Sequence, residues 1–170
     1  MGRNRETLVR SSCVILFMYP IAYITPSYRE GKKLRQLREA LTKIGVTVIP
    51  VELPYYSGPE TCLHLLSLIS IVDHQLAVIY PPLLSVPFWQ ELGWRGFRLI
   101  EVPDAEFATM GPNVLALAPG RCLMLEGNPL TQRRLEEAGC QVLTYRGNEL
   151  SLKAEGGPTC LTRPIWRERV

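Results

Sequence analysis

The sequence lacks the patterns that mark several large classes of protein. Its five cysteines are an odd number and form no CxxC pair, which argues against a disulfide framework and against a zinc site. No apolar run reaches the roughly 18 to 20 residues that a membrane span needs. The longest run, SSCVILFMYPIAYI, is interrupted by Pro20 and lacks the cleavage site of a signal peptide. We therefore expect a cytoplasmic protein that needs no metal or cofactor and has no membrane partner.

Charge of either sign is also sparse. The net charge is +3, charged residues make up 21% of the chain and hydrophobic residues 46%, which is ordinary globular composition. Basic residues cluster only in RNRETLVR and TRPIWRER, and no nucleic-acid motif accompanies them. This predicts a solvated surface and no nucleic-acid partner. A length of 170 residues is enough for one domain with a real core, so residues 1–170 are predicted to form a single domain.

A repeat of strand, strand, helix and strand is the main feature that the chain does have. Its copies span approximately residues 13–51, 63–102 and 113–145, and a tail of residues 146–170 follows. The third copy is the clearest, because NVLALA and RCLMLE flank Pro119-Gly120 as a hairpin would. A repeat of this length is typical of a ring or array in which each unit buries its face against its neighbours. Because each unit opens with a hairpin, the pattern predicts an α/β (α+β) fold with mixed sheets, a partial propeller of three ββαβ units and a closing strand.

Local signals place the remaining elements. Residues 14–18 and 21–25 are predicted to be strands, and Ser27 with Glu30 forms a capping box for the helix that follows. The second unit is predicted to begin with a strand that His64 heads and to turn at Asp73-His74. The tail is predicted to contain a turn of helix, a glycine loop and a last strand near residues 160–165.

Two residues in this scheme can carry chemistry. Cys160 follows the turn glycines Gly156 and Gly157, and His64 lies at the start of the second unit. A ring of repeats could bring the two together over its central axis. Taken alone, Cys160 is more often a partly buried cysteine, and His64, among leucines, more often a structural histidine. Both readings stay open on the residues alone.

Longer stretches around both residues resemble a known superfamily. NELSLKAEGGPTCLTRPIW and VPDAEFATMGPNVLALAPGRCLMLEGNPLTQRRLEEAGCQVLTY resemble the C-terminal part of the guanidine-modifying enzymes, and HLLSLISIVDHQLAVIYP resembles the segment around their histidine. This superfamily includes arginine deiminase, dimethylarginine dimethylaminohydrolase and the amidinotransferases. The similarity covers most of residues 30–170. It implies the pentein fold, a propeller of five ββαβ units, which agrees with the repeat.

The resemblance also implies a function and a set of site residues. Cys160 would be the nucleophile of a hydrolase or amidinotransferase that acts on an arginine-like substrate, and His64 would be its acid and base. Substrate-binding residues would include Gly156 and Gly157, whose backbone could approach the substrate. The acids considered as partners of the guanidinium group are Asp73, Glu106 and Glu155.

The sequence also departs from the superfamily pattern. Leu66 stands where many members have an aspartate, and three units are present where the superfamily has five. The alternative function is therefore a truncated, inactive relative that serves as a ligand-binding or oligomeric interaction domain. In either case a homodimer is predicted, because the long apolar run from Val14 to Ile24 would lie at an unmatched flank of the ring.

Overall fold

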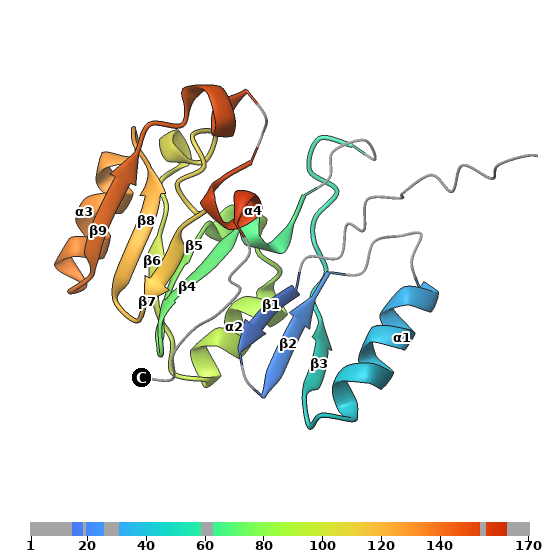
Figure 1. Cartoon of the computed structure of the whole chain (residues 1–170). Coiled ribbons are helices and arrows are strands. Elements are labelled where there is room, and N and C mark those ends of the chain that lie inside the picture. Colours follow the sequence, from blue (N-terminus) through green and yellow to red (C-terminus); the bar gives the residue numbers. More distant parts are fainter. Residues whose placement is uncertain (1–14, 19, 26–30, 59–62, 154–155, 163–170) are drawn as a thin grey trace, which may run out of the picture.

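The computed structural model describes residues 15–18, 20–25, 31–58, 63–153 and 156–162. Its strands and longer helices fall into three successive groups (Figure 1). The first comprises β1 (Ile15–Met18), β2 (Ile21–Ile24), α1 (Gly31–Thr42) and β3 (Thr47–Pro50). The second comprises β4 (Ile69–Asp73), β5 (Leu76–Ile79), α2 (Val86–Trp94) and β6 (Arg98–Glu101). The third comprises β7 (Leu115–Ala118), β8 (Arg121–Leu125), α3 (Pro129–Glu137) and β9 (Gln141–Tyr145), and the short helix α4 (Pro158–Leu161) follows in the tail.

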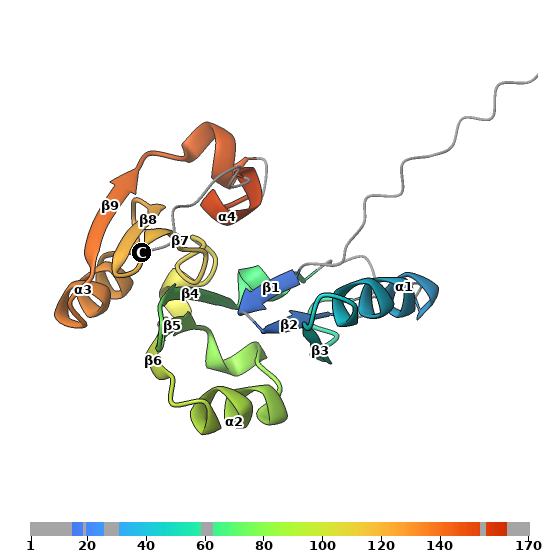
Figure 2. The same cartoon turned by 60° about the horizontal axis from the view of Figure 1, so that its bottom comes forward.

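Each group forms its own three-stranded sheet. The first two strands of each sheet pair antiparallel, and the third strand pairs parallel to the second after the helix. The predicted mixed α/β class is therefore confirmed. The predicted hairpin at Pro119-Gly120 is also present, and Gly120 adopts the positive φ of 66° that its turn requires. Figure 2 shows α1, α2 and α3 on the outside of the molecule, with β1, β4 and β7 on its inner side.

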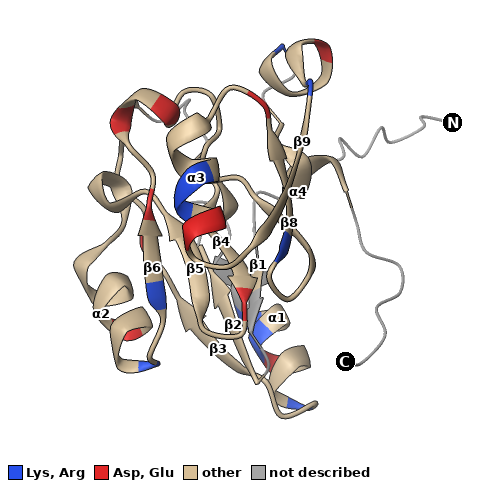
Figure 3. Cartoon of the chain, turned by 90° about the vertical axis from the view of Figure 1, so that its left-hand side faces the viewer, with Lys and Arg blue, Asp and Glu red and all other residues tan. Residues whose placement is uncertain are grey.

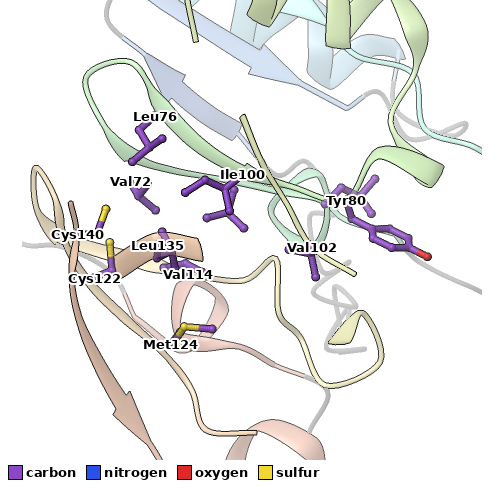
Figure 4. Close-up of a cluster of buried hydrophobic side chains, with 12 residues drawn as sticks. Val72, Leu76, Tyr80, Ile100, Val102, Val114, Cys122, Met124, Leu135 and Cys140 are labelled. Carbon is purple, nitrogen blue, oxygen red and sulfur yellow. The ribbon is translucent and has the colours of Figure 1, made fainter. Parts of the chain in front are cut away.

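Strand β5 explains how the sheets are held together. All four of its residues are buried, and successive side chains of a strand point to opposite faces. Leu76 (Figure 4) and Val78 enter a core shared with the third sheet. Ala77 and Ile79 enter a core shared with the first sheet. The middle sheet is thus packed on both faces, against the first sheet on one side and the third sheet on the other.

Polar contacts reinforce the junction between the second and third groups. Arg98 of β6 donates to the carbonyl of Ala138 at 2.6 Å, and Arg134 of α3 donates to the carbonyl of Glu101. In β4, the buried hydroxyl of Ser70 donates to the carbonyl of Pro112 at 2.7 Å and accepts from the backbone N–H of Val114 at 3.0 Å. These bonds fix the start of the third group against the second.

Charged residues are spread over the outside of the fold. Figure 3 shows basic and acidic positions along α2, α3 and the loops, without a continuous stretch of one sign in the part of the chain that the structure describes. Several of these residues form pairs within a helix turn, such as Arg133 with Glu137. Among the described residues, no helix has the length and apolar character needed to cross a bilayer.

Some expectations from the sequence need correction or fall outside the described residues. His64 does not head a strand: it is extended and precedes a 3₁₀ turn, Leu65–Ser67, so that β4 begins at Ile69. The turn forms because it lets Leu65 enter one core and Leu68 the other. The capping box at Ser27 and Glu30 lies outside the described residues.

The tail also differs from the prediction. Cys160 lies in helix α4, not in a last strand, and residues 163–165 of that predicted strand are outside the described residues. Pro158 favours this helix because its fixed φ suits a first helical position. A single π-helical turn, Asn148–Leu152, precedes it.

The apolar run near the start of the chain is mostly internal. Leu16, Ile21 and Ile24 are each less than 9% exposed within the single chain, and Val14 lies outside the described residues. These three residues therefore do not form the exposed flank from which the homodimer was predicted.

Candidate active site at Cys160

Cys160 is the exposed member of the three cysteines that the structure describes. It borders a cavity of about 80 Å³ that lies between the tail and the two later groups of strands. The residues that line this cavity are Ser67, Phe107, Met110, Asn113, Gly157 and Cys160. Segments far apart in the sequence therefore meet at the thiol.

The buried side chain of Asn113 connects those segments. Its amide nitrogen is 3.4 Å from Sγ of Cys160 and 3.4 Å from the carbonyl oxygen of Leu66. Its amide oxygen accepts from the backbone N–H of Thr159 at 3.0 Å and from the Thr159 hydroxyl at 2.9 Å. The N–H groups of a helix's first turn have no partner within the helix, so Asn113 caps α4 from another part of the chain.

Gly157 makes this arrangement possible. A Cβ at Gly157 would lie 2.3 Å from Cγ of Asn113 and 2.5 Å from its Oδ1. Its backbone, with φ of −76°, is in an ordinary region, so glycine is required here for space and not for conformation. The tail can approach Asn113 closely only because this side chain is absent.

Gly156 lies beside the cysteine, outside the group that lines the cavity. A Cβ there would meet the end of the Leu161 side chain at 3.3 Å and Cβ of Cys160 at 3.7 Å. Both glycines that the sequence singled out are thus near Cys160, and Gly157 has the tighter contact.

His64 directly precedes the 3₁₀ turn Leu65–Ser67, whose residue Leu66 is contacted by Asn113. Its Nδ1 is buried and has no hydrogen-bond partner among the residues that the structure describes. Burial lowers the pKa of His64 from its ordinary value, because removal from water disfavours the imidazolium ion. Leu66, whose carbonyl Asn113 contacts, is two residues further along. The structure therefore brings the histidine and cysteine segments to the same residue, Asn113.

Aromatic residues support one side of the cavity. Phe107 stacks on Tyr80 with ring centroids 4.0 Å apart, and the ring of Tyr56 meets Phe107 edge-on at 6.1 Å. The Tyr80 hydroxyl donates to Asp104 at 3.1 Å. Burial, with this hydrogen bond adding to it, raises the pKa of Tyr80. The wall around Phe107 is thus largely apolar.

Two of the acids singled out in the sequence, Glu106 and Asp73, are not among the residues that line this cavity. Both carboxylate oxygens of Glu106 bind the start of α3: they accept from the N–H groups of Leu130 and Thr131 and from the Thr131 hydroxyl. The expectation that Glu106 grips a substrate is therefore corrected, because its carboxylate caps a helix. The charge suits that position, since a helix N-terminus attracts anions.

Asp73 is also displaced from the site. It lies at the end of β4 remote from Ser67, where its Oδ1 accepts from the N–H of His74 at 2.7 Å. Its other oxygen lies near Gly120, in the turn between β7 and β8. Asp73 therefore lies between the hairpin turns at His74 and Gly120, and it does not contact Cys160. Glu155 lies outside the described residues.

The other described cysteines are core residues. Cys122 and Cys140 are buried, and burial raises the pKa of Cys122 to about 12. A thiol in that state is a poor nucleophile. Cys13 lies outside the described residues.

Sequence comparisons show which known proteins the chain resembles. Residues 84–167 match the family model described as arginine deiminase. An uncharacterised protein of Bacillus subtilis, YkgA, is 30% identical over 148 residues, which are 86% of this chain and 49% of that protein.

Solved structures share the fold. The dimethylarginine dimethylaminohydrolase DDAH from Pseudomonas aeruginosa superposes with a TM-score of 0.68 at 24% identity, over 86% of this chain and 52% of that one. SxtG, an amidinotransferase from Microseira wollei, superposes with a TM-score of 0.75 at 15% identity, over 92% of this chain and 47% of that one.

The family-model match and the shared fold support the superfamily of guanidine-modifying enzymes, which has the pentein fold. This is the superfamily that the sequence resemblance indicated. The chain spans at most about half the length of the curated relatives it matches.

Proposed function

We propose that the chain carries a guanidine-modifying site in which Cys160 is the nucleophile, His64 the acid and base, and an arginine-like molecule the substrate. The carrying observation is the exposed thiol of Cys160 at the edge of a small cavity, in contact with a buried amide donor. An exposed thiol held in a fixed orientation is the starting arrangement that covalent catalysis by cysteine requires.

The proposed reaction proceeds through a covalent adduct. The neutral imidazole of His64 first takes the proton of the Cys160 thiol. The resulting thiolate attacks the central guanidinium carbon, a C–N bond breaks, and the leaving amine takes that proton from His64. The product of this step is an S-alkylthiouronium on the enzyme. Water then gives a proton to His64 and attacks the same carbon, the C–S bond breaks, and the thiolate returns. In an amidinotransferase, an acceptor amine would take the place of water.

The environment of His64 supports its role. A buried polar atom without a partner is costly, on the order of 1 to 3 kcal/mol, and such atoms call for an explanation. A substrate or leaving amine that hydrogen-bonds to Nδ1 of His64 would be the missing partner. Because burial lowers the pKa of His64, the imidazole is poised to be neutral at physiological pH and can accept a proton.

Substrate contacts are proposed for Gly157 and Gly156 through their backbone, because both lie beside Cys160. Among the described lining residues there is no carboxylate. The cavity of about 80 Å³ is also well below the roughly 300 to 1,000 Å³ of pockets for small molecules. The described residues could therefore enclose the reacting group, but not a whole arginine-sized molecule. Glu155 remains a proposed carboxylate partner.

A pair of matched reagents tests this function. 2-Chloroacetamidine is a cation shaped like the end of a guanidinium, and 2-chloroacetamide is its neutral counterpart. In both, the thiolate displaces chloride and a C–S bond replaces the C–Cl bond. Intact-mass spectrometry should show a single adduct with the amidine, formed faster than with the amide and absent from Cys160→Ser. Equal rates with the two reagents would contradict a site for guanidinium-like cations.

The alternative function is an inactive relative that binds a ligand or takes part in an oligomer. The apolar wall at Phe107 and Met110 and the absence of a carboxylate among the described lining residues favour it. If Cys160 resists both reagents at neutral pH, this alternative is the better account. Homodimer formation and a cytoplasmic location stay predictions in either case.

A further inference from the structure

We propose that Asn113 is a positioning residue that orients the Cys160 sulfur and stabilises its thiolate form, while tying the cysteine segment to the histidine segment. This inference deepens the proposed function and rests on Cys160 being the nucleophile. Asn113 was not among the residues that the sequence pointed to as site residues.

The orientation of the Asn113 amide follows from its neighbours. The backbone N–H of Thr159 can only donate, so the atom 3.0 Å away must be the amide oxygen. The carbonyl of Leu66 can only accept, so the atom 3.4 Å away must be the amide nitrogen. The second N–H of that nitrogen is the one directed at Sγ of Cys160, at 3.4 Å.

The amide has little freedom to turn away from the sulfur. Its two acceptor positions are taken by the N–H and hydroxyl of Thr159, and it is only 3% exposed. Gly157 packs so directly against it that a Cβ at that glycine would lie 2.3 Å from Cγ of the asparagine. A rotation would break buried hydrogen bonds on both sides at once.

The backbone that carries Asn113 is equally fixed. The residues on either side of it, Pro112 and Val114, both bind the buried hydroxyl of Ser70 in β4. The N–H of Asn113 itself donates to the carbonyl of Met110 at 3.0 Å. The backbone of Asn113 is thus held by the second sheet as well as by its own loop. Its side-chain amide therefore has a fixed position relative to Cys160.

This geometry has a chemical consequence. A hydrogen bond donated to sulfur favours the charged thiolate over the neutral thiol, and the thiolate is the nucleophile. An amide on a rigid base also limits the directions in which Sγ can point, which lowers the cost of reaching the attacking geometry. Asn113 would therefore affect both the fraction of Cys160 that is thiolate and the direction in which its sulfur points.

Asn128 provides a matched comparison. It is as buried as Asn113, at 2% exposure. Its amide nitrogen donates to the carbonyls of Thr109 and Leu125, and its oxygen accepts from the Thr109 hydroxyl. No contact of Asn128 involves Cys160. Any effect that comes only from placing a charge or breaking bonds in the interior should appear in both asparagines.

The first test replaces each asparagine by aspartate. Asn113→Asp keeps an oxygen for Thr159, removes the donor to Sγ and adds a negative charge near it. Thiolate formation is followed by ultraviolet absorbance, as the difference from Cys160→Ser. In Asn113→Asp, the midpoint of the rise in absorbance should lie about one pH unit higher than in the parent chain. Alkylation by iodoacetamide at neutral pH should then be about tenfold slower. Asn128→Asp should leave the midpoint unchanged. An unshifted midpoint in a folded Asn113→Asp variant would overturn the proposal.

A second measurement needs no change at Asn113 and covers the case in which that variant does not fold. The side-chain amide resonances of Asn113 in ¹⁵N NMR should titrate with the Cys160 thiolate and lose that titration in Cys160→Ser. Those of Asn128 should not respond. Amide resonances of Asn113 that ignore thiolate formation would refute the contact. If Asn113 responds but chloroacetamidine shows no preference over chloroacetamide, the positioning role stands and the guanidinium substrate fails.

Discussion

Gly157→Ala should be a strongly destabilising substitution for a purely steric reason. The new Cβ would lie 2.3 Å from Cγ, 2.5 Å from Oδ1 and 2.8 Å from Cβ of Asn113. Carbon atoms pack at about 3.5 to 4.0 Å, so the overlap exceeds what a small adjustment relieves. Asn113 cannot yield without losing its hydrogen bonds to Thr159 and to Leu66.

The magnitude follows from opposing effects. Overpacking a close contact costs about 1 to 3 kcal/mol, and separating a buried amide from its partners costs about 1 to 3 kcal/mol more. Alanine restricts the unfolded chain and returns about 0.4 to 1 kcal/mol, since Gly157 has an ordinary φ. We expect a net loss of about 3 kcal/mol in the free energy of unfolding.

Gly156→Ala is the matched control. Its Cβ would first meet the flexible end of Leu161 at 3.3 Å, so the change in stability should stay within about 1 kcal/mol of zero. Urea denaturation followed by circular dichroism measures both variants, with the m-value as the check on two-state unfolding. If Gly157→Ala unfolds at the same urea concentration as Gly156→Ala, the close approach of the tail to Asn113 is wrong.

Three further predictions concern a helix cap, a histidine and self-association. Glu106→Gln should lower the free energy of unfolding by about 1 to 3 kcal/mol, because a glutamine amide cannot replace both carboxylate oxygens at the start of α3. Urea denaturation should show little change for Glu137→Gln, whose side chain is exposed, and equal effects of the two substitutions would refute the helix cap. Because the pKa of His64 is lowered in the folded state, the unfolded chain binds more protons than the folded chain near and below the ordinary histidine pKa of 6.5. Stability, measured by urea denaturation, should therefore fall as the pH drops below that value, and an equally steep fall in His64→Gln would refute this origin. Light scattering should give a dimer at micromolar concentration that Leu143→Lys weakens, and a monomer at every concentration would end the homodimer prediction.

The choice of Leu143 in the last test comes from the third sheet. Leu123 pairs with Leu115 on one side and with Leu143 on the other, so the three share a face opposite the core side of Cys122. Leu143 is 37% exposed. We choose this face for the test because Leu16, Ile21 and Ile24, in the run near the start of the chain, are buried.

Local patterns were sufficient to predict the units of the fold. Alternation of apolar residues and the Pro119-Gly120 turn each act over a few residues, and the structure contains the corresponding elements. The prediction was wrong at His64 and at Cys160, where long-range packing decides the conformation. Leu65 and Leu68 enter different cores, which requires a turn where the apolar alternation suggested a strand.

The acids show a different kind of error. Glu106 and Asp73 were weighed as substrate ligands because a guanidinium needs carboxylates and these were near in sequence. Nearness in sequence does not specify which way a side chain faces. Glu106 faces the unpaired N–H groups of α3, a need that the sequence of that helix does not reveal, because no residue at its own N-cap makes a side-chain capping bond.

Asn113 could not have been identified from the sequence, and the reason explains how the site is built. It opens the third unit, where asparagine is unremarkable, and its partners lie 46 and 47 residues away, in the tail and beside the histidine. Only the packing of the second and third sheets, with Ser70 between them, brings these segments to one amide. Cys160 lies on a short helix and His64 lies just before a 3₁₀ turn, and such short elements fix a side chain less firmly than a long helix or a sheet does. A shared buried amide gives both segments one reference point, so perturbing Asn113 should affect the cysteine and histidine segments together, whereas perturbing Asn128 should affect neither.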